Sequence, residues 1–275
     1  MRRLLTGAEL IPDKSTGSEP AANGDSGIEA AALQRMFGRD GLYLFGFTLQ
    51  LATSAVVTPI LTRSVTPTSF GAIATCLAIV QVLVIVAGFG LNIGISRVYS
   101  SEGPHRAEGL AWSGVLVAGV VASAVLVSTP LWVSLVGLSH DHVALDIAVL
   151  QAAAAAATAG MITLARCRDK LAVFSVMVAL QSILAQVAGV IALTLIAASP
   201  AVYLGALAVT QSAALLVGIC ALRPRTWQSL SLRTSGLLVG SAALVPQQLA
   251  SYVLNSSDRL LIQGHLGFSA GDSNI

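Results

Sequence analysis

Asp258 and Arg259 are adjacent charged residues within an apolar stretch near the end of the chain. Ionisable side chains are costly to bury in such a stretch, and they often have functional roles there. Neighbouring side chains on a helix diverge by about 100°, so these two cannot form an ideal ion pair with each other. A guanidinium can hold phosphate oxygens through two parallel hydrogen bonds. Two interpretations of Arg259 follow: it contacts an anionic lipid headgroup, or it forms a structural salt bridge with another helix.

Side-chain amides recur along the apolar part of the chain, where an amide that faced lipid would lack hydrogen-bond partners. The residues are Gln50, Gln81, Asn92, Gln151, Gln181, Gln186, Gln211, Gln247, Gln248 and Asn255. Hydrogen bonds between neighbouring helices would satisfy them. Alternatively, some of them line a hydrophilic cavity for a hydroxyl-rich solute. For this second interpretation we select, besides Asp258 and Arg259, the candidate substrate-binding residues Gln50, Gln81, Gln181 and Asn255.

Other kinds of site chemistry find little support in the sequence. The chain contains no His-Glu-x-x-His motif and no phosphate-binding glycine loop. Its three cysteines, Cys76, Cys167 and Cys220, are far apart and form no Cys-x-x-Cys pair. We therefore expect no catalytic residues, no metal site and no cofactor, and we expect that the protein is not an enzyme.

Composition indicates what kind of element holds these residues. Of 275 residues, 55% are hydrophobic and 10% are charged, whereas soluble domains carry about 25% charged residues. Because this number of charges is too small to cover the surface of a soluble fold, the sequence predicts an integral membrane protein. The net charge of +2 leaves no basic stripe for phosphate groups, which excludes a nucleic-acid partner.

The elements that position the polar residues are apolar runs, each long enough to cross about 30 Å of hydrocarbon as a helix. Short connections between them make consecutive helices antiparallel neighbours. The sequence therefore predicts an all-α, polytopic membrane helix bundle. Its seven runs cover residues 41–62, 72–96, 110–136, 143–165, 171–197, 201–222 and 236–264, with the first connections at 63–70 and 98–109.

The first 40 residues differ from the rest, because they mix Pro, Gly, Ser and charges. We expect a disordered tail that ends either in a short interfacial helix or in the first turn of the following helix. Lys and Arg of short loops stay on the cytoplasmic side. With a cytoplasmic N-terminus, that side holds 13 of the 15 basic residues, while the outer loops hold only Arg63. The sequence thus predicts a multi-pass protein with its N-terminus in the cytoplasm.

Three segments resemble bacterial polysaccharide and O-antigen flippases. Residues 245–271, with Asp258 and Arg259 before apolar residues and a Leu-Gly turn, look like the seventh helix of that family. Residues 59–71 are similar to its first external loop, although Thr66 departs from the usual Gly or Leu. Residues 89–97 resemble its Gly-Leu stretch that ends in a basic residue.

The resemblance implies membership of the multidrug, oligosaccharidyl-lipid and polysaccharide exporter superfamily, whose members have two similar six-helix lobes. A shift of 200 residues places Leu61 on Leu261 and Gly71 on Gly271. On this basis we expect a cytoplasmic tail over 1–40 and a six-helix lobe over 41–222. Residues 223–275 are expected to hold a cytoplasmic loop and the first helix of a truncated second lobe.

The function implied by the resemblance is translocation of a lipid-linked oligosaccharide across the bacterial inner membrane, for cell-surface polysaccharide or lipopolysaccharide biosynthesis. The implied partners are that substrate, membrane lipids, and a polysaccharide polymerase or glycosyltransferases. One alternative is an exporter of drugs or other cations, which would require an acidic residue deep in the bundle, where the complete runs offer only the shallow Asp146. The other alternative is an inactive, truncated membrane subunit.

Overall fold

The computed structural model describes residues 39–133, 142–223, 240, 243 and 245–254. The expectations for the tail and for residues 255–275 lie outside this part of the chain. The chain divides at Phe45 into two units. The helices below belong to the second unit, Gly46–Ile275, except for the first residues of α2.

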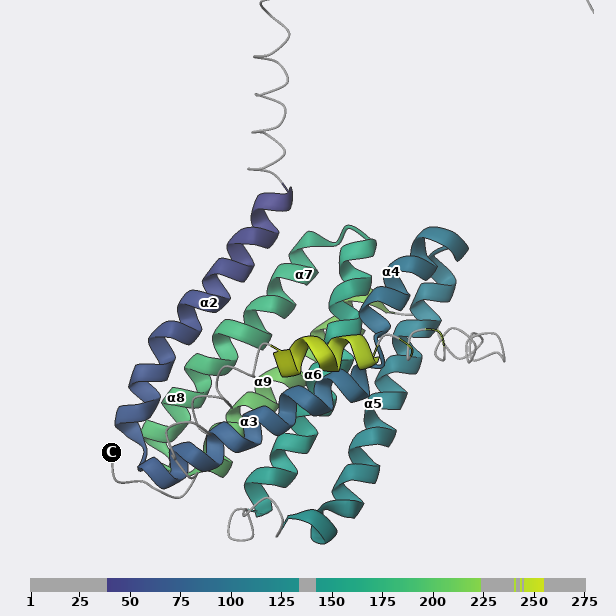
Figure 1. Ribbon diagram of the computed structural model, residues 1–275. Coiled ribbons are helices and arrows are strands. Elements are labelled where there is room, and N and C mark those ends of the chain that lie inside the picture. The colour runs from purple at the N-terminus through teal and green to yellow at the C-terminus, as the bar shows by residue number, and fades with distance from the viewer. Residues whose placement is uncertain (1–38, 134–141, 224–239, 241–242, 244, 255–275) are drawn as a thin grey trace, which may run out of the picture. The chain divides into compact units, whose positions relative to one another are not determined.

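The described residues form helices and no strand. Figure 1 shows them in chain order: α2 (Arg39–Ser64), α3 (Pro67–Gly88), α4 (Leu91–Glu102), α5 (Pro104–Trp132), α6 (His142–Cys167), α7 (Leu171–Val178), the π-helix η1 (Ala179–Leu184), α8 (Ala185–Leu195) and α9 (Pro200–Leu222). A further short helix covers residues 245–254. Five helical stretches in the described residues are long and apolar enough to cross a membrane: Pro67–Glu102, Pro104–Trp132, His142–Cys167, Leu171–Leu195 and Pro200–Leu222. The all-α membrane fold predicted from the sequence is confirmed.

Helix α6 lies at the centre of the bundle and packs against α3, α4, α5, α7 and α9. In its most apolar stretch 61% of the residues are buried, compared with 22–33% in the other four membrane-length stretches. The cause is its run of alanines, including the buried residues Ala154–Ala157, because small side chains let helix backbones approach closely.

Proline and a capping hydroxyl start two of the helices after very short connections. The Thr66 side chain accepts a hydrogen bond from the Ser69 backbone N–H at 3.3 Å, directly before Pro67. The Ser199 side chain accepts one from the Val202 N–H at 3.4 Å, directly before Pro200. A hydroxyl at the N-cap and proline at the first helical position are both favoured, because the first N–H groups of a helix have no partner inside it.

The second predicted run is not one helix. It breaks between α3 and α4, where Phe89 and Gly90 take positive φ angles of 46° and 64°. The connection predicted over residues 98–109 is also wrong, since α4 continues to Glu102 and α5 begins at Pro104. Only Gly103 separates them, at φ 94°, a conformation that glycine adopts without a steric cost. Phe89 and Gly90 thus turn the chain inside the 36-residue stretch Pro67–Glu102, and Gly103 turns it directly after that stretch.

Gly189 of α8 lies close against α9. A Cβ atom added there would lie 2.6 Å from Cε2 of Tyr203 and 2.8 Å from Cδ1 of Leu207. The Tyr203 side chain is 3% exposed, so its ring has little room to move. We therefore expect Gly189→Ala to lower the free energy of unfolding by about 1–3 kcal/mol, as overpacking does. Thermal unfolding of the detergent-solubilised chain, followed by helical circular dichroism, measures this.

Gly205→Ala on α9 is the matched control, because a Cβ there meets no atom within 4 Å. It should unfold at the wild-type temperature or above, since alanine favours helix over glycine. Equal melting temperatures for Gly189→Ala and Gly205→Ala would refute the close packing of α8 on α9.

Candidate functional site

A cleft of about 440 Å³ opens beside the break between α3 and α4. Volumes of roughly 300–1,000 Å³ are usual for sites that take small molecules. In Figure 1 the helix of residues 245–254, in yellow, crosses in front of α6. That helix forms one wall of the cleft. The lining residues are Val84, Ile85, Gly88, Gly90, Asn92, Ile93, Ala156, Ala159, Gln247, Gln248, Ser251 and Tyr252.

The helix break supplies a second wall. Gly88 ends α3, Gly90 precedes α4, and both line the cleft. Non-helical backbone at membrane depth is tolerated only where it is buried in protein or lines a cavity. Discontinuous helices form the substrate sites of many transporters for this reason. The break between α3 and α4 therefore helps to form the cleft.

The polar side chains of the cleft come from two elements. Asn92 lies on α4, whereas Gln248, Ser251 and Tyr252 lie on the helix of residues 245–254. Their i, i+3 and i+4 spacing places these three on one helical face. The Ser251 hydroxyl donates to the Gln247 carbonyl at 3.0 Å. Side-chain amides offer donors and acceptors together, so this face can bind a hydroxyl-rich molecule.

Of the residues selected from the sequence, the two whose side chains the structure describes, Gln81 and Gln181, do not line this cleft. Gln81 is exposed on α3. Gln181 lies in η1, where its backbone carbonyl accepts a hydrogen bond from Nε2 of Gln211 at 3.4 Å. The Gln50 side chain and residues Asn255, Asp258 and Arg259 lie outside the described residues. A substrate role for all six stays a prediction.

The contact between Gln181 and Gln211 matches the adhesive interpretation of the amides, because it joins η1 to α9. η1 lies within the membrane-length stretch Leu171–Leu195, α9 is itself of membrane length, and Gln211 is 7% exposed. Among the described residues, the Oε1 atoms of Gln151, Gln181 and Gln211 are buried without a hydrogen-bond partner. A π-helical turn at Gln181 is notable, since such turns are frequent at functional positions of long helices.

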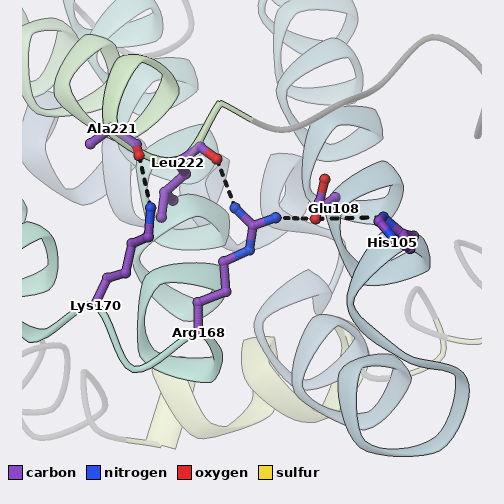
Figure 2. A network of polar contacts seen from close by, with 6 residues as sticks. All are labelled: His105, Glu108, Arg168, Lys170, Ala221 and Leu222. Carbon is purple, nitrogen blue, oxygen red and sulfur yellow. Dashed lines mark hydrogen bonds and ion pairs between the residues drawn. The ribbon is translucent and has the colours of Figure 1, made fainter.

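A charged network lies at one end of the bundle (Figure 2). Arg168, in the turn between α6 and α7, forms an ion pair with Glu108 of α5 and donates from Nη1 to the Leu222 carbonyl at 2.7 Å. Lys170 donates from Nζ to the Ala221 carbonyl at 3.1 Å, and His105 Nδ1 lies 4.0 Å from Glu108 Oε1. Glu108 is only 4% exposed.

This network ties three connections together: the start of α5, the turn after α6 and the end of α9. Cationic side chains at a helix C-terminus satisfy its last carbonyls and interact favourably with its dipole. The three connections are those that the charge bias assigned to one side of the membrane, so the structure brings the predicted set to one end. Sequence reasoning missed Glu108, because its partner lies 60 residues away.

A family model described as polysaccharide biosynthesis protein matches residues 38–270, most of the chain. The chain belongs to this family. The resemblance to polysaccharide flippases found in the sequence is thereby confirmed at family level. This polysaccharide biosynthesis family protein is a membrane protein, with several helices able to span the bilayer. Neither the curated proteins nor the solved structures compared with it gave a significant match.

Proposed function

We propose that this polysaccharide biosynthesis family protein moves a lipid-linked oligosaccharide across the bacterial inner membrane, from the cytoplasmic to the outer leaflet. The observation that carries the proposal is the polar cleft at the α3–α4 break, inside an otherwise apolar bundle. Membership of the family indicates the process in which the protein takes part, which is polysaccharide biosynthesis. The cleft suggests the step, which is passage of a hydrophilic group through hydrocarbon.

Physical chemistry explains why such a cleft would serve this step. A glycan headgroup loses its hydrogen bonds with water when it enters about 30 Å of hydrocarbon. Amides and hydroxyls on the cleft wall replace those bonds, so they lower the barrier without any covalent chemistry. On this proposal the protein is a translocase and not an enzyme, and it needs no cofactor.

The lipid end of such a substrate carries phosphate, for which Arg259 is the proposed partner. By position in the sequence Arg259 follows Tyr252 by seven residues, two turns of the predicted seventh helix. A guanidinium suits phosphate oxygens, and we propose that Asp258 and Asn255 also take part in binding. A structural salt bridge is the alternative role of Arg259. A polymerase or glycosyltransferases would handle the glycan before or after transport.

The cleft favours an oligosaccharide over the alternative of a drug or cation exporter. None of the described residues that line it is acidic, whereas an organic cation in a desolvated site needs a carboxylate or an aromatic cage. Among the lining residues that the structure describes, only Tyr252 is aromatic.

We expect the charged end of the bundle, with Arg168 and Lys170, to face the cytoplasm. In a background without native cysteines, Ser101→Cys at the end of α4 should then be protected from an impermeant maleimide in intact cells. Thr68→Cys at the start of α3, which is also exposed, should react. The reverse pattern would invert the topology.

Deletion of the gene in its host tests the proposed function. Lipid-linked oligosaccharide should accumulate in the cytoplasmic leaflet while polysaccharide disappears from the surface, because synthesis of the precursor continues. Restored expression of the chain should reverse both changes. Deletion cells with normal surface polysaccharide and no accumulated precursor would refute the proposal.

A further inference from the structure

We infer that the cleft at the α3–α4 break is a subsite for an uncharged sugar unit and rejects acidic sugars. This inference rests on the proposed function and names the class of headgroup that the cleft selects. It depends on three properties of the lining residues: their charge, their hydrogen-bonding groups and their apolar floor.

The charge of the lining is the first property. None of the twelve described lining residues is Asp, Glu, Lys or Arg. Arg97 of α4 follows the lining residue Ile93 by four residues, but it is not among the lining residues. A carboxylate moved from water into a site without a cationic partner loses hydration that neutral hydrogen-bond donors replace only in part. A uronic acid or other acidic sugar should therefore be disfavoured.

The hydrogen-bonding groups are the second property. Asn92, Gln247 and Ser251 are exposed, and Gln248 and Tyr252 are half-buried, so their polar groups can be reached. Each amide presents two N–H donors beside an acceptor oxygen, and a hydroxyl both donates and accepts. Sugar hydroxyls have the same double character, so pairs of neighbouring hydroxyls match these groups without any net charge.

The apolar floor is the third property. Val84, Ile85 and Ile93 also line the cleft, together with Ala156 and Ala159 of α6. A sugar ring has C–H faces as well as a hydroxyl edge, and an aromatic ring such as Tyr252 is a suitable flat surface for a C–H face. A lining that combines polar and apolar side chains suits a neutral sugar better than a fully solvated ion.

Site-directed labelling of the purified full chain tests the inference. Cys76, Cys167 and Cys220 are first replaced, and Ser251→Cys is introduced, because this small, exposed side chain lines the cleft. The probes are oligosaccharides released by hydrolysis from the host's own surface polysaccharide and separated into neutral and acidic fractions. At about ten times its Kd a bound sugar fills roughly nine tenths of the sites. A saturating concentration of the neutral fraction should therefore slow maleimide labelling of the cysteine at position 251 about tenfold.

The acidic fraction should change the rate less than twofold, and neither fraction should protect the control Ser101→Cys. Asn92→Lys, added to the Ser251→Cys chain, should let the acidic fraction protect, because it supplies the missing cation. Equal protection by both fractions, protection by neither, or no labelling of free Ser251→Cys would each overturn the inference. If labelling overturned the inference but deletion cells still accumulated the precursor, the proposed translocation would remain supported. If deletion cells accumulated no precursor, translocation itself would be rejected.

Discussion

Arg168→Ala should lower the free energy of unfolding by about 3 kcal/mol, which is the largest stability effect that we expect from a single substitution. Removal of one partner leaves the other charge buried and uncompensated. Here the remaining charge is Glu108, whose side chain is 6% exposed, and the Leu222 carbonyl loses its donor as well. Denaturant unfolding of the detergent-solubilised chain measures the change.

Arg106→Ala is the matched control. Arg106 forms an ion pair with Glu102 one helical turn away, but its side chain is 45% exposed. Exposed pairs of this kind contribute about 0.3–0.5 kcal/mol. The double replacement Glu108→Leu with Arg168→Met should restore most of the loss, because a buried pair can often be exchanged for apolar residues. If Arg168→Ala and Arg106→Ala were equally stable, the network would not hold the three connections together.

Gly88→Leu should reduce translocation of the lipid-linked oligosaccharide by at least about tenfold, the effect of 1.4 kcal/mol of lost binding. A Cβ at Gly88 meets no atom within 4 Å, so the fold can accept a side chain there. Because Gly88 lines the cleft, that side chain would take space that the headgroup needs. The measurement is the rate of translocation in reconstituted vesicles at equal protein content.

Gly71→Leu provides the comparison on the same helix. A Cβ at Gly71 also meets no atom within 4 Å, but Gly71 is not among the lining residues. It should translocate at the wild-type rate. Equal rates for the two variants would show that the cleft is not on the path of the substrate.

Much of the fold could be predicted because apolar runs and helix ends leave local signals. A run of about 20 apolar residues indicates a spanning helix, and Pro67 and Pro200 mark helix starts as expected. The break at Phe89 and Gly90 could not be predicted, because glycine is also common inside membrane helices that continue. The tight turn at Gly103 was missed for a different reason, because residues 98–109 are polar enough to resemble a longer loop.

The cleft was harder to predict than the fold. Asn92, Gln247 and Gln248 were recognised as amides in apolar runs, but depth alone does not show which face of a helix an amide occupies. The choice of Gln81 and Gln181 depended on depth, and the structure places neither in the cleft. Tyr252 and Glu108 carried no periodic signal, since their surroundings are formed by helices distant in the sequence.

Translocation by the purified chain is the most direct test of the account. Vesicles with and without the chain would contain a fluorescent polyprenyl-linked neutral oligosaccharide in both leaflets, and an impermeant reductant would be added outside. Protein-free vesicles should lose only the signal of the outer leaflet. Vesicles with the wild-type chain should also lose the inner signal as the lipid crosses, while Gly88→Leu vesicles should keep it. An inner signal equally stable in wild-type and protein-free vesicles would contradict the proposal that this chain moves lipid-linked oligosaccharides.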